Sequence, residues 1–364
     1  MDGRSGRVTL VDVARTAGVS KAVASAVLSG SSGTVRAGLA TREKVLSAAR
    51  GLGYAPHYGA RSLRRSRANR ITLVVHDLSN PYYADIATAA AAAATARGFE
   101  LHVLQAGRPE AERGAIEKLR SGFSDAVLVA TSRHGQEHAA LPALCELAHR
   151  GIPTVVLIDR SPDPAIPAVR IDDEAAAWLG TTHLLRLGHR RIAYLGGPPS
   201  PRDLPVSHAV DRRQGYRRAL EEAGLPADPR LERRGAVTPG GGRELARQIL
   251  AERDRPTALF CFNDMVAIGA ISALHEAGLS VPDEMAVVGF DGIELGEFAV
   301  PPLTTVAHSR ADLGQAAVDA ALARLDGALA ERERLLPVEL VVRRSCGADA
   351  PRRWPSQEVH RREG

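Results

Sequence analysis

Polar side chains close several apolar runs in the second part of this chain, where ligand chemistry could occur. Asp159, Asn263 and Asp291 each end a run rich in Val, Ile, Leu or Phe. Carboxylates accept hydrogen bonds from hydroxyl and amine groups, an amide both donates and accepts, and Arg212 supplies a fork of donors. A lone aspartate at a strand end can instead cap the following helix. The residue types alone leave a ligand site and a set of helix caps as alternatives.

Sequence signatures of catalysis and of metal binding do not occur in the chain. Gly240–Gly242 lacks the Lys and Ser or Thr of a phosphate loop, and there is no H-E-x-x-H or G-x-S-x-G motif. The three cysteines lie far apart, which argues against a disulfide framework or a zinc cluster. His57 has no ligating partner one helical turn further on. The sequence therefore predicts a binding protein without catalytic residues, metal or cofactor.

The elements that position these residues follow a basic N-terminal region. Residues 1–70 contain 13 Lys and Arg against three acids, a net charge of +10, and the other 294 residues carry −5. A basic segment joined to a mildly acidic body is typical of a polyanion-binding module. The alternative is a solvated basic face, which charge alone does not exclude.

The N-terminal region also has a helical pattern. Thr9 can cap a short helix with Asp12 in its first turn, and Ser20 can cap a second helix over 21–28. A third helix is predicted over 41–52. Small residues around the turn between the first two helices allow them to cross closely. This pattern predicts a helix-turn-helix, whose second helix normally enters the major groove of DNA.

The N-terminal region resembles the lactose-repressor (LacI/GalR) family of bacterial regulators in two stretches, VTLVDVARTAGVSKAVASAVLSG and TREKVLSAARGLGYAPHYGARSLR. The resemblance implies a hinge helix after the third helix, with Leu63 as an apolar wedge in the central minor groove. It implies DNA contacts by Thr9, Ser20, Lys21, Ala22, Ser25, Ala26, His57, Ala60, Arg61 and Leu63.

Two departures from the family pattern concern the operator sequence. Lys21, Ala22 and Ala26 stand where the family usually presents larger base readers, and alanine cannot make the bidentate guanine contact of arginine. The loop GSSGTVRAGLAT is about three residues longer than in the lactose repressor, an insertion that Gly and Ser make tolerable. The DNA-binding assignment stands, whereas the operator sequence is not determined.

Beyond Arg70, apolar strand-like runs such as ITLVVHD and ALFCFND alternate with Ala-rich helical stretches. This alternation predicts parallel sheets covered on both faces, and 364 residues allow two or three domains. The resemblance continues from residue 8 to about residue 346. It implies an all-α helix-turn-helix head plus an α/β body of two doubly wound parallel-sheet subdomains, the type I architecture of periplasmic binding proteins.

The resemblance also sets the expected domain limits. A DNA-binding domain is expected over 1–56, a hinge helix and linker over 57–69, and an effector-binding and dimerisation domain over 70–346. Its N-subdomain takes in about 70–171 and 310–334, and its C-subdomain about 172–307 and 336–346. The Pro- and Arg-rich tail, 347–364, is expected to be disordered.

A ligand cleft between the two subdomains is implied as well, since ligands of open α/β sheets sit beyond the carboxyl ends of the strands. The resemblance reverses the preference for helix caps at several of the strand-end residues. It assigns effector contacts to Tyr82, Tyr83, Asp159, His208, Arg212, Val237, Asn263, Asp291 and His308. Val237 stands where the family often places a large aromatic, so stacking on the ligand is not expected there.

Together these observations predict a homodimeric transcription regulator, most simply a repressor, that binds pseudo-palindromic operator DNA. A small effector, a sugar or sugar derivative, is expected to change its operator affinity. The chain has no apolar stretch long enough for a membrane span and no secretory signal, so a cytoplasmic, nucleoid-associated location and no membrane partner are expected. The alternatives are a solute-binding protein and a sugar- or nucleotide-processing enzyme on the same α/β scaffold.

Overall fold

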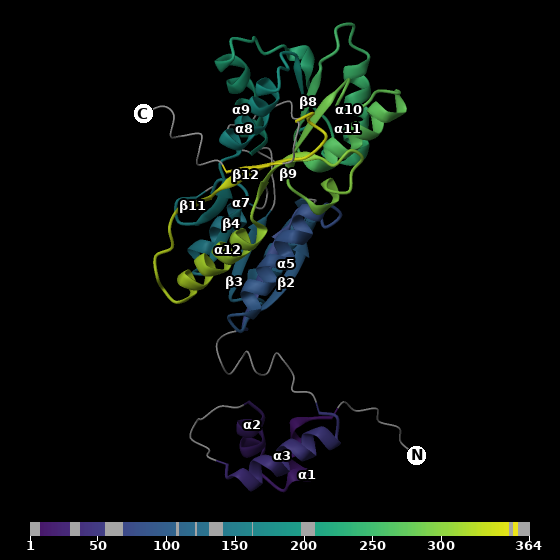
Figure 1. The fold of residues 1–364 in the computed structure, drawn as a ribbon. Helices are drawn as coiled ribbons and strands as arrows, with labels where there is room; N and C mark the ends of the chain where they lie inside the picture. Colours follow the sequence, from purple (N-terminus) through teal and green to yellow (C-terminus); the bar gives the residue numbers. More distant parts are fainter. Residues whose placement is uncertain are drawn as a thin grey trace. The chain divides into compact units, whose positions relative to one another are not determined.

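The structure is a computed structural model that describes residues 8–29, 37–54, 68–106, 109–120, 122–130, 141–161, 163–197, 208–348 and 352–355. The chain separates into two compact units, Met1–Asn69 and Arg70–Gly364, which we call the head and the body (Figure 1). Within the described ranges, no helix is long and apolar enough to cross a membrane.

In the part of the head that the structure describes, three short helices surround one small core. Helix α1 (Leu10–Ala17) starts with a capping box between Thr9 and Asp12 and stops at Gly18, whose φ of 65° is left-handed. Helix α2 (Lys21–Ser29) and helix α3 (Leu39–Gly51) follow. The core consists of small apolar side chains from all three helices: Val13, Ala14, Ala24, Val27, Val45 and Ala49. Small core residues let the helices pack closely, as the sequence pattern predicts.

The described residues of the body form two sheets, each of which defines a subdomain. The strands of the first sheet lie in the order β11 (Glu333–Leu336), β5 (Ala168–Ile171), β4 (Thr154–Leu157), β3 (Ala126–Ala130), β1 (Arg70–Val75) and β2 (Glu100–Gln105). Every neighbouring pair in this sheet is parallel. Its helices are α5 (Pro81–Thr95), α6 (Pro109–Arg120), α7 (Leu141–His149) and α12 (Arg310–Leu325).

The second sheet is parallel except at one edge. Its strands lie in the order β13 (Arg352–Pro355), β12 (Val338–Val342), β10 (Thr304–His308), β9 (Ala286–Asp291), β8 (Ala258–Cys261), β6 (Ile192–Leu195) and β7 (Glu232–Arg233). Strands β12 and β13 run antiparallel to their neighbours. Its helices are α8 (Asp173–Arg186), α9 (His208–Glu222), α10 (Pro239–Leu250) and α11 (Asp264–Glu276).

The sequence predicts a disordered tail over 347–364, but Arg352–Pro355 within it form strand β13. Residues 352–355 pair with β12, and the register joins Trp354 to Leu340. Strand β12 would otherwise be the edge of the second sheet, with a row of unpaired backbone groups. Backbone pairing of this kind needs no apolar content in the added strand, which explains why the composition of the tail gave no sign of it.

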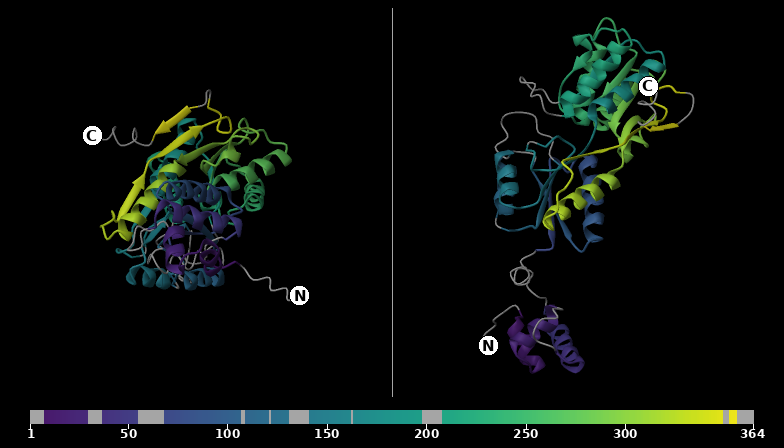
Figure 2. Two further views of the ribbon diagram at one scale, coloured as in Figure 1. Left: turned by 90° about the horizontal axis from the view of Figure 1, so that it is seen from below. Right: turned by 90° about the vertical axis from the view of Figure 1, so that its left-hand side faces the viewer.

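Helices cover both faces of each sheet, because successive strand residues point to opposite sides. Tyr194 and Phe260 pack in the core that contains α8 and α9, whereas Leu195 and Cys261 pack with α10 and α11. The first sheet repeats this division, with α5 and α12 on one face and α6 and α7 on the other. Figure 2 shows the layers of the body from two further directions.

The chain crosses between the subdomains at three points that lie close to strand ends. Strand β5 of the first sheet leads into α8, which packs on β8, β9, β10 and β12 of the second sheet. Strand β10 of the second sheet leads back into α12, which packs on β3, β4 and β5. Pro337 separates β11 of the first sheet from β12 of the second. These crossings bring strand ends of both sheets to one region.

Candidate functional site

The second helix of the head has one face that is not buried in the core. The Ser20 hydroxyl accepts a hydrogen bond from the Val23 amide at 3.2 Å and so caps α2. Ala24 and Val27 face the core, whereas Lys21 and Ala22 are exposed. Ser25 and Ala26 are half-buried and follow Lys21 and Ala22 by four residues, so they lie on the same side of the helix. The structure therefore brings the predicted base-reading residues of α2 together.

Thr9 has a structural role within the head. Its hydroxyl accepts from the Asp12 amide. The Thr9 hydroxyl and the Thr9 amide both donate to the Asp12 carboxylate, and these two bonds lower the pKa of Asp12. The predicted hinge contacts lie outside the described residues: His57, Ala60, Arg61 and Leu63. The wedge role of Leu63 stays a prediction.

A cavity of about 170 Å³ lies in the body, and side chains of both subdomains line it. Seven of the nine predicted effector contacts are among its lining residues: Tyr82, Tyr83, His208, Arg212, Val237, Asn263 and Asp291. The other two, Asp159 and His308, do not line the cavity but contact residues that do. Asp159 approaches His208, with 3.5 Å between Oδ2 and Nδ1, and His308 Nε2 lies 3.1 Å from the Tyr82 hydroxyl.

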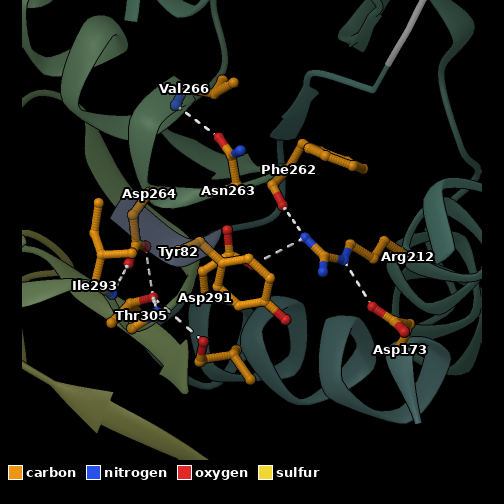
Figure 3. A network of polar contacts seen from close by, with 12 residues as sticks. Tyr82, Asp173, Arg212, Phe262, Asn263, Asp264, Val266, Asp291, Ile293 and Thr305 are labelled. Atoms are coloured by element: carbon orange, nitrogen blue, oxygen red, sulfur yellow. Dashed lines mark hydrogen bonds and ion pairs between the residues drawn. The ribbon is translucent and has the colours of Figure 1, made fainter. Parts of the chain in front are cut away.

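Arg212 lies at the centre of a buried polar network (Figure 3). Its Nε donates to Asp173 Oδ1 at 2.8 Å, and its Nη1 donates to the Phe262 carbonyl at 2.7 Å. The same Nη1 lies 3.4 Å from Asp291 Oδ1. The guanidinium also covers the Phe290 ring, 3.6 Å from the ring centre. These four contacts hold the guanidinium in one orientation against the cavity.

Asp291 combines backbone strain with burial. It ends β9 with a φ of 103°, a left-handed conformation that L-residues rarely adopt. Burial raises the pKa of its carboxyl to about 6, although Arg212 and Arg310 lower it. Arg310 also donates a hydrogen bond to the Asp291 carbonyl. Strain of this kind persists only where the surroundings hold the residue, which is typical of ligand sites.

Tyr82 connects the two subdomains at the side of the cavity. It lies in the first turn of α5, in the first subdomain, and its hydroxyl meets His308 at the end of β10 in the second. The Arg310 guanidinium lies over the Tyr82 ring, 4.6 Å from the ring centre. Burial lowers the pKa of His308 well below its usual range, so this imidazole is neutral at pH 7.

Further aromatic and neutral groups complete the wall. The Phe262 ring lies 5.8 Å from the His208 ring and 4.8 Å from the Arg212 guanidinium. Burial lowers the pKa of His208 to about 4, so it too is uncharged at neutral pH. Phe262 supplies an aromatic face where Val237 offers none.

One of the polar residues at the strand ends caps a helix, which was the alternative to ligand binding that the sequence left open. Asn263 Oδ1 accepts from the Val266 amide at 2.9 Å and caps α11, while the residue also lines the cavity. Asp264 accepts from the Ile293 amide at 2.8 Å and from the Thr305 hydroxyl at 2.6 Å. Burial raises the pKa of Asp264 to about 7. Asn263 can therefore cap α11 and still contact a ligand, whereas Asp264 stabilises the turn after β9 through these two hydrogen bonds.

The sequence interpretation missed several residues of this site, of which three bear on its chemistry. Asp173 is the strongest partner of Arg212, and it follows β5 in the same way that the recognised acids follow their strands. His76 stands at the end of β1 and lines the cavity. The strand-end criterion could have found both. Phe262 carried no signal, because an aromatic next to an apolar strand looks like core.

The arrangement suits reversible binding of a small polar molecule. One guanidinium lies between two carboxylates, the Asn263 amide and the neutral His208 imidazole line the same cavity, and aromatic rings form further walls. Such a wall offers donors and acceptors for hydroxyl groups and flat faces for an apolar ring surface.

Comparisons with known protein families match both parts of the chain. Residues 9–57 match the family described as bacterial regulatory proteins, lacI family. Residues 181–346 match a periplasmic binding protein-like domain. The first match covers the three helices of the head, and the second covers most of the second subdomain.

Individual proteins match over nearly the full length. The HTH-type transcriptional regulator DegA of Bacillus subtilis is 34% identical over 341 residues, which cover 93% of this chain and 98% of DegA. The lac repressor dimer bound to operator and the anti-inducer ONPF is 31% identical, with a TM-score of 0.80 over 94% of this chain and 100% of that one. The transcriptional regulator CelR in complex with cellobiose is 30% identical, with a TM-score of 0.69 over 93% of this chain and 100% of CelR.

Proposed function

Because this chain belongs to the lacI family of bacterial regulatory proteins, we propose that a sugar or sugar derivative bound in the cavity around Arg212 controls its affinity for operator DNA. The protein is a transcriptional regulator and not an enzyme. As a DNA-binding member of a bacterial family it works in the cytoplasm, and we place it at the nucleoid.

The observation that carries the proposal is the network of Arg212, Asp173 and Asp291 at the wall of the cavity. Its charged groups are already oriented by contacts within the protein, so a ligand meets a preformed set of donors and acceptors. Phe262, Tyr82 and Tyr83 offer apolar faces beside it. The similar regulator CelR binds cellobiose, which supports a carbohydrate as the ligand class.

On the DNA side, we assign residues 1–56 to operator recognition, 57–69 to the hinge, and 70–346 to effector binding and dimerisation. The net charge of +10 on residues 1–70 supports binding to the phosphate backbone. The similar lac repressor is a dimer on its operator, which supports a homodimer on a pseudo-palindromic site here. Sedimentation velocity of the full chain, with and without operator, tests this assembly.

The two functions require a link between the cavity and the DNA. Since both subdomains line the cavity, a ligand can favour one relative arrangement of them over another. It shifts operator affinity only to the extent that it binds the two arrangements differently. We expect the proposed hinge, 57–69, which lies just before Arg70 in the sequence, to transmit this difference in subdomain arrangement to the DNA-binding residues.

The test starts from an operator found by genome-wide footprinting. Thermal unfolding of the full chain is measured against a panel of neutral sugars, sugar phosphates and nucleosides, and any stabilising compound is then tested in operator binding. We expect a sugar to raise the melting temperature and to change operator affinity. A panel in which only nucleosides act would overturn the sugar assignment, and hydrolysis or modification of a compound would favour the enzyme alternative.

A variant locates the site once a ligand is found. Asp291→Asn keeps the shape of the side chain and removes its charge, so it should weaken ligand binding by about ten- to a hundredfold, or about 1.5–3 kcal/mol. Operator affinity without ligand should hardly change. Asp283→Asn, at an exposed position, is the matched control. Unchanged ligand affinity in Asp291→Asn, measured by calorimetry, would show that the ligand binds elsewhere.

A further inference from the structure

A bidentate ion pair outside the cavity joins the two subdomains of the body. Arg160 follows β4 of the first subdomain, and Asp211 lies in the first turn of α9 in the second. Arg160 Nη2 lies 2.9 Å from Asp211 Oδ2, and Arg160 Nη1 donates to Asp211 Oδ1 at 3.2 Å. Two parallel bonds of this kind fix both the distance and the relative orientation of the groups they join.

The environment of the pair favours a strong interaction. The side chain of Asp211 is only 6% exposed, whereas that of Arg160 is 40% exposed. Burial raises the pKa of Asp211, while the charges of Arg160 and Arg170 lower it. Removing Arg160 therefore leaves a buried carboxylate whose remaining cationic neighbour, Arg170, already bonds Glu333 at 2.7 Å.

The position of the pair connects it to the cavity without making it part of the lining. Asp211 is adjacent to Arg212 and three residues after His208, so one turn of α9 carries the ion pair and two cavity side chains. On the other partner, Ile158 adopts a φ of 63° just before Asp159 and Arg160. A left-handed conformation is costly for a β-branched residue, so surrounding contacts must hold this segment in place.

We propose that Arg160 and Asp211 are positioning residues that form a latch between the subdomains. The latch holds the first turn of α9 against the end of β4, keeps the cleft closed, and directs His208 and Arg212 toward the cavity. Asp159–His208, Tyr82–His308 and Arg310–Asp291 also join the two subdomains, so loss of the latch loosens the closed arrangement without abolishing it. The latch concerns the body alone and does not depend on the identity of the effector.

The experiment measures the distance between the subdomains in the full chain by double electron–electron resonance. Spin labels are attached at Thr95→Cys, at the end of α5, and at Ala251→Cys, after α10, both exposed positions. The half-buried Cys145 is replaced by alanine, and the buried Cys261 and Cys346 stay in place. The latch is removed by Arg160→Ala, by Asp211→Asn and by both together.

The expected result is a second, open distance population in each single variant. Loss of a partly exposed bidentate pair should raise the ratio of open to closed molecules about fivefold. The double variant should open no further than either single variant, because the two substitutions remove one interaction. Arg160→Lys keeps the charge and should restore part of the closed population.

Arg217 and Glu232 provide a matched control within the second subdomain. Their bidentate pair has distances of 2.7 and 2.8 Å and side-chain exposures of 45% and 6%, close to those of the latch. Arg217→Ala should leave the distance distribution unchanged. A wild-type distribution in both Arg160→Ala and Asp211→Asn, or equal opening in Arg217→Ala, would overturn the proposal. Failure of the sugar assignment would leave the latch result unaffected, which separates the two proposals.

Discussion

Replacing Arg212 by methionine should destabilise the body strongly, because the arginine compensates two buried carboxylates. Its side chain is 7% exposed, and those of Asp173 and Asp291 are 3% and 6% exposed. Removal of one partner of a buried ion pair costs about 3–5 kcal/mol, since the remaining charge stays buried without compensation. The Phe262 carbonyl loses its donor as well. We therefore expect a loss of about 3–5 kcal/mol at pH 8.

The loss should be smaller in mild acid. The folded-state pKa of Asp291, about 6, exceeds its ordinary value of 3.8, so the native state binds more protons than the unfolded state between these values. Stability from this group is therefore fully present below about pH 4 and falls as the pH rises toward 6. Without the Arg212 guanidinium the pKa of Asp291 rises further, so the fall in stability with rising pH extends above pH 6. For each unit by which the pKa of Asp291 rises in the variant, the loss of unfolding free energy between pH 5 and pH 8 grows by about 1.4 kcal/mol.

Urea unfolding of wild type and Arg212→Met at pH 5 and pH 8 measures both effects. Arg243→Ala is the control, because its ion pair with Glu276 is exposed, at 45% and 41%, and its loss is expected to leave the stability nearly unchanged. A change below about 1 kcal/mol in Arg212→Met, or the same change at both pH values, would refute the view that Arg212 compensates buried charge.

Three further predictions test packing, capping and the hinge. Gly215→Ala should destabilise the body by about 1–3 kcal/mol, measured by urea unfolding, because the added Cβ would lie 2.1 Å from the Glu174 carbonyl oxygen. Gly114→Ala is the control, because its added Cβ would meet no atom within 4 Å and should not destabilise the body. Thr9→Ala should weaken α1 by about 0.5–2 kcal/mol, seen as faster amide exchange in the head with an unchanged body. Leu63→Ala should greatly weaken specific operator binding at an unchanged melting temperature; a lower melting temperature would mark Leu63 as a core residue instead.

The sequence determined the class of fold and the limits of most elements, because these depend on neighbours within a few residues. The cap at Thr9, the turn at Gly18 and the apolar stripe through Val27 all involve contacts along one short segment. The alternation of apolar runs with helices predicted the two doubly wound subdomains, which the relatives share. Strand β13 escaped prediction, because backbone pairing at a sheet edge leaves no pattern in side-chain types.

Tertiary structure alone decided which polar residues meet and what charge they carry. Arg212 contacts Asp173 and Asp291, which lie 39 and 79 residues away, because the topology brings the ends of β5 and β9 to the same region as α9. Burial then moves the pKa of Asp291 up and that of His208 down, and burial is a property of the assembled core. Arg160 and Asp211 are likewise 51 residues apart in the sequence, and only the packing of the two subdomains brings them together.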